Sequence, residues 1–148
     1  MSKKYTLPCF LEGEVTQAAY VRWLGRKSIA HQRRDKKRGN SEATNEAYKM
    51  AIHAATADSR GLDEYTGETL RWGLISTYDN EKSKLDRRTY KATLDLLPTV
   101  DHVGDGLGEA NFKICGWRTN DAKGAMSLDD FIALCRLVVA HAERNGVR

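Results

Sequence analysis

The sequence predicts an α+β fold built around a short β-hairpin and the helix that follows it. Additional helices precede the hairpin, and an amphipathic helix closes the chain. Three observations lead to this fold class. Proline-free runs rich in Ala, Lys, Arg and Gln favour helices in the first third of the chain. Residues 98–117 alternate apolar and polar side chains around a glycine-rich turn, which is typical of a hairpin. The last segment repeats apolar residues at helical spacing.

The chain of 148 residues divides into two regions by composition. Residues 1–60 form a basic helical region, and residues 61–148 contain the hairpin and the chemistry-bearing side chains. A chain of this length suits one domain with a modest hydrophobic core. We therefore expect the two regions to pack together as one compact domain.

The basic region predicts two helices. Residues 14–37 contain no proline and carry a thin apolar stripe, and Gly39 with Asn40 forms a stop signal after them. A second helix is expected to begin at Ser41 or Thr44, because both residues are good N-caps. That helix should end just before Gly61.

The middle of the chain has a strand-like pattern followed by a helical pattern. Residues 62–78 include Leu70, Trp72 and Ile75, which are strand-prone, so the pattern favours a strand although its alternation is imperfect. Residues 81–97 return to a helical pattern, which Pro98 ends. A helix is therefore expected directly before the hairpin.

The hairpin is predicted from two strands, residues 99–103 and 112–117, which flank the glycine-rich turn 104–108. A helix begins at Thr119, and the last helix begins after Ser127, where two acidic residues suit the positive end of the helix dipole. Apolar residues from Leu128 to Val139 keep helical spacing. We expect this apolar face to belong to the core of the domain itself.

Charge is distributed unevenly along the chain. Residues 1–40 carry ten basic and three acidic side chains, a net charge of +7, whereas the other 108 residues carry 14 basic and 17 acidic side chains, a net charge of −3. A basic arm on an acidic body favours a polyanionic partner such as DNA, although a solvated helix face is the simpler alternative. The predicted nucleic-acid contacts are Arg26, Lys27, Arg33, Arg34, Lys36, Lys37, Arg38 and Lys123.

Composition excludes several classes of protein. No stretch approaches the roughly 20 apolar residues that a membrane-spanning helix needs, so no membrane partner is expected. The N-terminal apolar stretch is too short for a secretory signal, which predicts a cytoplasmic location. Cys9, Cys115 and Cys135 stand far apart without any C-x-x-C pair, so neither a disulfide framework nor a structural zinc site is expected. Cys115 and Cys135 are most simply core residues.

Residues 98–123 hold the side chains that could carry chemistry. His102 follows Asp101 on the first strand, Asn111 opens the second strand, and Asn120 lies on the following helix. Hydrolysis of a phosphodiester needs a base that works near neutral pH, which histidine supplies, and a hard divalent cation, which binds oxygen ligands. Each residue also has a structural alternative: a satisfied core histidine, a turn residue or an N-cap.

These residues resemble the motif of the HNH nucleases, which have the ββα-metal fold. The family shows an Asp/His-His pair on the first strand, an Asn before the second strand, and an Asn or His on the helix, often followed by Lys. Here Asp101-His102, Asn111 and Asn120 match in order, with Lys123 after them. The upstream residues 65–70, YTGETL, also resemble the Y-C-G-E-x-L element of many members.

The resemblance implies a fold, an activity and site roles. It implies a ββα-metal hairpin-helix core and hydrolysis of DNA with one divalent cation, commonly Mg²⁺, with Mn²⁺ as a substitute. It assigns His102 as the general base, Asn111 as the residue that orients the His102 region, and Asp101 with Asn120 as metal ligands. One active site per chain leaves a homodimer as an option for double-strand cutting. The alternative function is a non-catalytic nucleic-acid-binding protein that uses the basic N-terminal helix.

Overall fold

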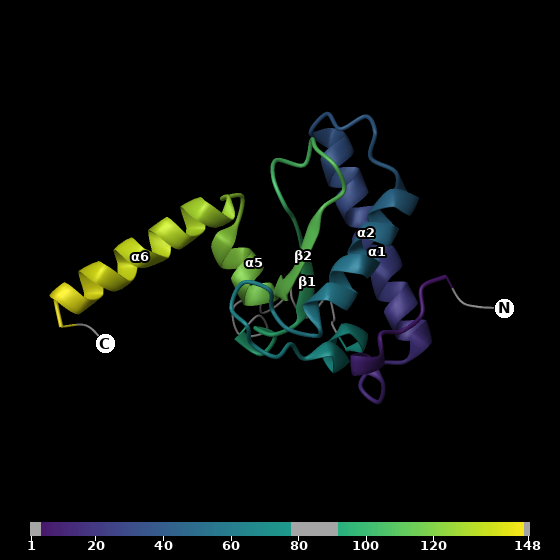
Figure 1. Cartoon of the computed structure of the whole chain (residues 1–148), viewed down its shortest axis with the longest axis horizontal. Coiled ribbons are helices and arrows are strands. Elements are labelled where there is room, and N and C mark those ends of the chain that lie inside the picture. The colour runs from purple at the N-terminus through teal and green to yellow at the C-terminus, as the bar shows by residue number, and fades with distance from the viewer. Residues whose placement is uncertain (1–3, 78–91, 147–148) are drawn as a thin grey trace.

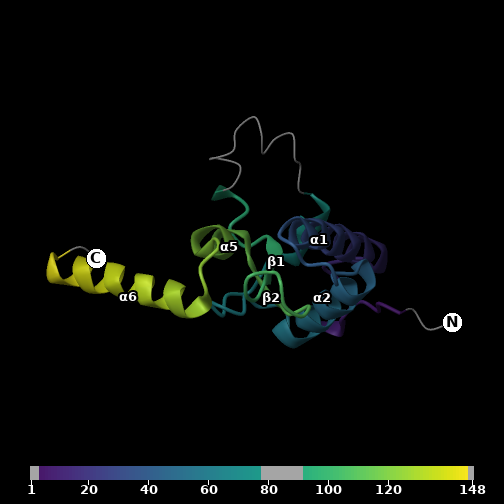
Figure 2. The same ribbon diagram turned by 90° about the horizontal axis from the view of Figure 1, so that it is seen from above.

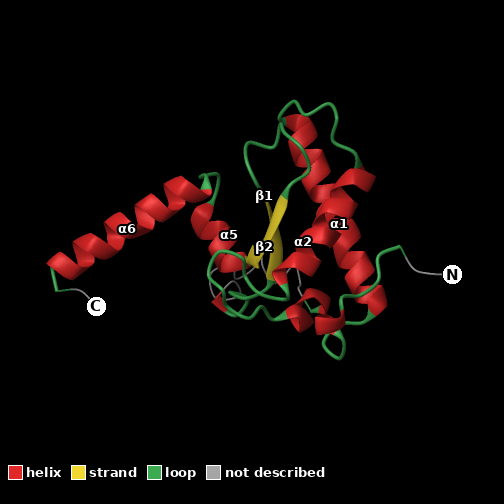
Figure 3. Ribbon diagram, viewed as in Figure 1, coloured by secondary structure: helices red, strands yellow, loops and turns green. Residues whose placement is uncertain are grey.

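The computed structural model describes residues 4–77 and 92–146, and within these ranges the fold is mixed α and β, as predicted. Within these two ranges the regular structure consists of four α-helices, a two-stranded antiparallel sheet and two short 3₁₀ helices (Figures 1 and 3). The elements in chain order are η1 (Cys9–Leu11), α1 (Gln17–Lys37), α2 (Asn45–Ser59), η2 (Trp72–Ser76), β1 (Pro98–His102), β2 (Phe112–Gly116), α5 (Trp117–Lys123) and α6 (Leu128–Arg144).

Both predicted N-terminal helices are present, and each has a side-chain cap at its start. The hydroxyl of Thr16 accepts from the backbone N–H of Ala19, and that of Thr44 accepts from Ala47, each over 3.1 Å. These bonds satisfy backbone donors that an uncapped first turn would leave without partners. The two helices lie side by side and bury a shared core. Its largest fully buried members include Tyr20, Trp23, Leu24, Tyr48 and Ile52.

The predicted hairpin is confirmed, and its register decides which side chains share a face. Val100 pairs with Ile114, Asp101 with Lys113, and His102 with Phe112. Successive side chains of a strand point to opposite faces, so Asp101 and His102 face different sides of the hairpin. In both views of the chain, the hairpin lies between α1 and α2 on one side and α5 on the other (Figures 1 and 2).

The prediction of a strand within residues 62–78 is wrong for residues 62–77, the part of this segment that the structure describes. A single bridge between Leu62 and Thr69 and the helix η2 take its place. The reason is that the backbone of this segment makes other hydrogen bonds. The N–H of Asp63 donates to the nearby carbonyl of Glu68, and the N–H of Glu64 donates to the distant carbonyl of Ile114. These bonds fold the segment into a turn held on the edge of β2. Most of the helix predicted over residues 81–97 lies outside the described residues, and residues 93–96 form turns.

The last helix is present with the predicted Ser127 cap, but its predicted place in the core is wrong. No residue of α6 is buried, and the helix projects away from the rest of the chain (Figures 1 and 2). The core is instead closed by residues of the earlier elements, among them Trp23 and Trp72, whose rings meet edge to face at 5.2 Å. Cys135 is therefore exposed, whereas Cys115 is buried as expected. No helix within residues 4–77 and 92–146 is long and apolar enough to cross a membrane.

Candidate functional site

The carboxylate of Asp101 is the centre of the candidate site. It lies on β1 and is 9% exposed. Its Oδ2 accepts a hydrogen bond of 2.6 Å from the hydroxyl of Tyr65 and lies 2.9 Å from the ammonium of Lys123 on α5. Burial and the bond to Asp101 raise the pKa of Tyr65, so the phenol stays a donor. Three segments far apart in sequence thus converge on one carboxylate.

Tyr65 reaches this position because Asp63 fixes the loop before it. The side chain of Asp63 is 1% exposed and accepts four hydrogen bonds. Two come from the backbone of its own loop, and two come from the β2–α5 junction: the N–H of Gly116 at 2.8 Å and the hydroxyl of Thr119 at 2.7 Å. A Cβ at residue 116 would lie 2.7 Å from the carbonyl of Asp95, so glycine is needed for this close approach.

Asn120 lies on the same helix as Lys123, three residues earlier, and is half-buried. Residues three apart share a helix face, which places the Asn120 amide on the side of α5 that carries the Lys123–Asp101 contact. Carboxylate and amide oxygens are donors that Mg²⁺ and Mn²⁺ accept. The Asp101 carboxylate already faces a positive charge in this structure. Asp101 and Asn120 would supply two oxygen ligands to such a cation, and the cation would have to replace the Lys123 ammonium.

His102 occupies the opposite face of the hairpin and is 8% exposed. Its Nδ1 lies 2.5 Å from Oδ2 of Asp35 on α1, and its Nε2 lies 3.1 Å from the backbone carbonyl of Glu109. Tyr48 donates a second hydrogen bond of 2.7 Å to the same Asp35 oxygen, and the imidazole packs on the ring of Phe112 at 4.6 Å. Both ring nitrogens of His102 therefore face oxygen atoms of the protein.

Asp35 was not predicted from the sequence to be part of the site. Its side chain is fully buried, although its neighbours Arg33, Arg34, Lys36 and Lys37 are exposed. The signal available in the sequence is that Asp35 is the one acid within RRDKKR. An acid on the inward side of a basic helix has a basic or hydrogen-bonding partner when it is buried. Here the partner is His102, 67 residues further along the chain.

The turn between the strands is closed by backbone bonds and by a second unassigned residue. Asn111 is exposed, and its backbone carbonyl accepts from the N–H of Val103 over 2.8 Å. Its contribution in this structure is thus to the backbone of the turn. Asn40, at the end of α1, is 7% exposed, and its amide donates to the carbonyl of Gly106 over 2.9 Å. Asn40 therefore ties the turn to the basic helix.

The eight predicted nucleic-acid contacts differ in exposure: six are exposed, whereas Lys27 is half-buried and Lys123 is buried. Six of them are exposed on α1 or at its end: Arg26, Arg33, Arg34, Lys36, Lys37 and Arg38. Arg22, Arg26, Arg33 and Lys37 follow helical spacing, so they form a basic stripe along one side of α1. Lys123 belongs to a different setting, because it is 6% exposed and pairs with Asp101.

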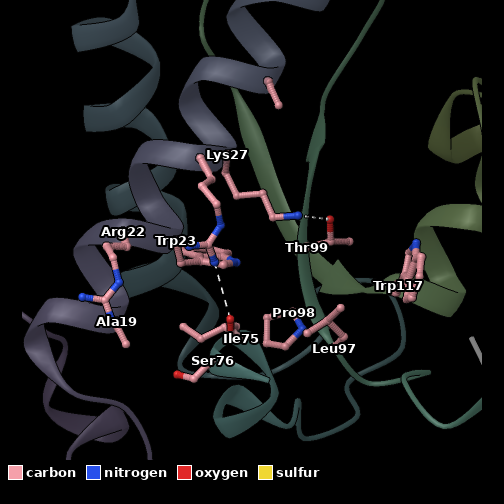
Figure 4. Close-up of a pocket in the computed structure, with 12 residues that line it drawn as sticks. Ala19, Arg22, Trp23, Lys27, Ile75, Ser76, Leu97, Pro98, Thr99 and Trp117 are labelled. Carbon is pink, nitrogen blue, oxygen red and sulfur yellow. Dashed lines mark hydrogen bonds between the residues drawn. The ribbon is translucent and has the colours of Figure 1, made fainter. Parts of the chain in front are cut away.

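Lys27 lies at a hollow of about 630 Å³ beside this stripe (Figure 4). The hollow is bounded by α1, η2, the start of β1 and Trp117 of α5, and Arg22 and Arg26 also line it. The ammonium of Lys27 donates to the hydroxyl of Thr99 over 3.1 Å. Burial, followed by the charge of Arg26, lowers the pKa of Lys27 to about 8. An anion in this hollow would meet three basic side chains.

Comparison of the chain with protein-family models, curated proteins and solved structures returns no match. Its function is therefore inferred from the residues and contacts of this chain. The structure brings Asp101, Tyr65 and Lys123 into contact and places Asn120 on the same helix as Lys123. It places His102 on the other face of the hairpin.

Proposed function

We propose that this chain is a metal-dependent endonuclease similar to the HNH family, which hydrolyses DNA phosphodiester bonds. One arrangement carries the proposal. Asp101 on β1 faces α5, the helix that follows the hairpin directly and carries Asn120 and Lys123. The Tyr65 element, which resembles a second family motif, meets the same carboxylate. Three separate parts of the resemblance thus lie together on one side of a hairpin.

In this proposal Asp101 and Asn120 hold one divalent cation, Mg²⁺ or Mn²⁺. When bound there, the cation would neutralise negative charge that develops on the phosphate and on the leaving oxygen. Tyr65 keeps the Asp101 carboxylate oriented through its hydrogen bond. Lys123 balances the carboxylate charge in the cation-free protein, and after displacement its ammonium is free to contact a phosphate oxygen.

In this proposal His102 is the general base that takes a proton from the attacking water. In the structure its Nδ1 contacts the carboxylate of Asp35. The proton must be accepted at Nε2, which in this structure faces the carbonyl of Glu109. The proposal therefore requires the turn over residues 103–110 to release Nε2, and it requires the ring to leave the Asp35 contact and reach the Asp101 side of the hairpin. His102 is the last residue of β1, and the exposed turn begins directly after it, so the change would fall at a strand end.

The basic stripe and the hollow at Lys27 supply the DNA contacts in this proposal. Lys27 bonds to Thr99, and Thr99 shares its strand face with Asp101, two residues away. A phosphate backbone that follows α1 would therefore pass next to the face that carries Asp101. Contacts of this kind position the duplex without reading its sequence.

The direct test is nicking of supercoiled plasmid with Mg²⁺ or Mn²⁺, with EDTA as the metal-free control. We expect metal-dependent nicking by the wild-type protein, and a loss of at least about 100-fold in His102→Ala and Asn120→Ala. His141→Ala is the matched control, because His141 is an exposed histidine on α6. Asn120→Ala leaves the buried hydrogen bonds of His102 in place. A loss of nicking activity in this variant therefore cannot result from disruption of those hydrogen bonds. If the wild-type protein nicks no faster than His102→Ala, the enzyme proposal fails.

A non-catalytic nucleic-acid-binding protein is the second candidate. The observation that favours it is that both side chains assigned to catalysis already have partners: Asp101 pairs with Lys123, and both ring nitrogens of His102 have partners. This candidate predicts salt-sensitive DNA binding that is indifferent to metal and unchanged by Asn120→Ala. Fluorescence anisotropy with a labelled duplex, with and without Mn²⁺, separates the two functions.

A further inference from the structure

The hollow at Lys27 gathers positive charge without an acidic partner. Arg22, Arg26 and Lys27 line it, and none of the other described residues that line it is acidic. The hydrogen-bond partners of the two inner cations are neutral (Figure 4). The ammonium of Lys27 donates to the hydroxyl of Thr99 over 3.1 Å, and the guanidinium of Arg26 donates to the backbone carbonyl of Ile75 over 3.4 Å.

This concentration of charge is unfavourable for the protein by itself. Arg22 and Arg26 are four residues apart on α1, where like charges repel. Lys27 is half-buried, and burial together with the charge of Arg26 lowers the pKa of its ammonium, because the surrounding protein does not compensate its charge. An anion in the hollow would relieve both effects, so the hollow favours a negatively charged ligand.

Three cations around one hollow favour a phosphate monoester over a phosphodiester. A phosphate within a nucleic-acid strand carries a single negative charge, whereas a monoester carries between about 1.5 and 2 negative charges at pH 7. The guanidinium groups of Arg22 and Arg26 can each donate two parallel hydrogen bonds to phosphate oxygens, and the ammonium of Lys27 adds a point charge. The phosphate that gains most from this hollow is therefore a terminal one.

The size and walls of the hollow indicate that the phosphate carries an organic group. Its volume of about 630 Å³ lies in the range of pockets that hold whole small molecules. Ala19, Leu97 and Pro98 give it apolar walls, which a bare phosphate ion could not use. The hollow therefore has room for the sugar and part of the base next to the phosphate.

The basic stripe of α1 indicates that the ligand continues beyond the hollow. Arg22 and Arg26 belong to both features, and the stripe goes on through Arg33 to Lys37. Arg26 and Lys37 are separated by about 16 Å along the helix axis. A small phosphate compound would fill the hollow without reaching the stripe, whereas a polyanion that ends in the hollow would use both.

From these observations we propose that the hollow at Lys27 binds the terminal phosphate of a DNA strand, whose following phosphates lie along the basic stripe. The choice of DNA as the polymer rests on the proposed function, but the binding itself needs no catalysis. Thr99 precedes Asp101 by two residues on the same strand face, a distance of about 7 Å along β1. A strand end held in the hollow would therefore lie next to the Asp101 side of the hairpin.

The test compares short single-stranded oligonucleotides of one sequence by fluorescence anisotropy in EDTA, where metal-dependent cleavage cannot occur. The oligonucleotides carry a phosphate at the 5′ end, at the 3′ end or at neither end. We expect one of the two phosphorylated strands to bind the wild-type protein at least about 10-fold more tightly than the strand with two hydroxyl ends. Equal affinities for all three strands would overturn the proposal.

Two lysine variants then locate the preference. Lys27→Met should bring the affinity ratio of phosphorylated to hydroxyl-ended strands close to one, because it removes the ammonium from the hollow. Lys37→Met is the matched control, since Lys37 is exposed on the stripe and does not line the hollow. It should weaken the binding of all three strands alike and keep the ratio.

Arg22→Met guards against a folding effect, because Arg22 is an exposed residue that lines the same hollow. It should also lower the ratio, and circular dichroism should show the wild-type fold for both hollow variants. A ratio that persists in Lys27→Met and Arg22→Met would place the terminal phosphate elsewhere and overturn the proposal.

Thermal unfolding with ligand separates a strand end from a free anion. The phosphorylated strand should raise the Tm of the wild-type protein more than inorganic phosphate does at the same concentration. An equal rise would assign the hollow to free phosphate and overturn the proposal. Failure of this proposal is distinct from failure of the proposed nuclease function, because supercoiled plasmid has no strand ends and the binding assay needs no cleavage.

Discussion

Removal of the Lys123 ammonium should expose how the Asp101 carboxylate is stabilised. The two side chains are 7% and 12% exposed and lie 2.9 Å apart. In Lys123→Met the length of the side chain is nearly kept and the charge is lost, so Asp101 stays nearly buried and keeps its hydrogen bond from the Tyr65 hydroxyl. Leaving one member of a buried pair uncompensated costs about 3 kcal/mol of unfolding free energy. For a chain of this size, that loss lowers Tm by roughly 6–12 °C.

The double-mutant cycle tests whether this cost comes from the pair. Asp101→Asn should cost about 2 kcal/mol, because it leaves Lys123 without its carboxylate. The combination Asp101→Asn/Lys123→Met removes both charges and should cost about 2 kcal/mol in total, so the coupling energy is about 3 kcal/mol. Urea unfolding followed by the fluorescence of the buried Trp23 and Trp72 measures all four proteins. Additive losses, or a Lys123→Met protein as stable as the wild type, would refute the reasoning.

The same variants examine the proposed cation site without any activity assay. If Asp101 and Asn120 bind Mn²⁺, Lys123→Met should recover stability in Mn²⁺ by about 3 kcal/mol once the ion exceeds its Kd by 100-fold. Asp101→Asn/Lys123→Met should recover nothing, because the charged ligand is gone. If Mn²⁺ raises the unfolding free energy of both variants equally, Asp101 is not a ligand of the ion.

Two further predictions concern pH. Burial lowers the pKa of His31 to about 4, so the folded protein keeps this ring neutral while the unfolded chain takes up a proton below about pH 6.5. Unfolding free energy should therefore fall by about 3 kcal/mol as pH drops from 6.5 to 4. His31→Gln should flatten this slope in urea titrations while His141→Gln leaves it unchanged, and equal slopes would contradict the assignment. Because the pKa of Lys27 is lowered to about 8, DNA affinity measured by anisotropy at constant ionic strength should weaken several-fold between pH 7 and pH 9.5. Lys27→Arg keeps its charge over that range, so its affinity should be flat, and a parallel decline in both proteins would exclude Lys27 as the cause.

Local signals in the sequence were sufficient for most of the regular structure. The caps Thr44 and Ser127, the alternation in β2, and Pro98 at the start of β1 each act over a few neighbouring residues. These signals placed the helices α1, α2 and α6 and the hairpin within a few residues of their observed bounds. The element order around Asp101 and Asn120 followed from the same reasoning.

Contacts between distant residues account for what the sequence did not predict. The turn at residues 63–68 depends on hydrogen bonds that Asp63 accepts from Gly116 and Thr119, which lie 53 and 56 positions further along the chain. These bonds override the strand preference of the neighbouring residues. The Asp35–His102 contact joins residues 67 positions apart. For α6, the amphipathic spacing predicted one apolar face that packs against other residues. The spacing does not tell whether those residues belong to the same chain.

The side chain of Asp35 links the two halves of the molecule mechanically. It projects inward from α1, on the side of the helix away from the basic stripe, and holds the imidazole at the end of β1. A duplex that pulls or rotates α1 would therefore move the ring of His102 through a single short bond. If the chain binds DNA along α1 as proposed, DNA binding and the position of the His102 ring are therefore coupled through the Asp35 carboxylate.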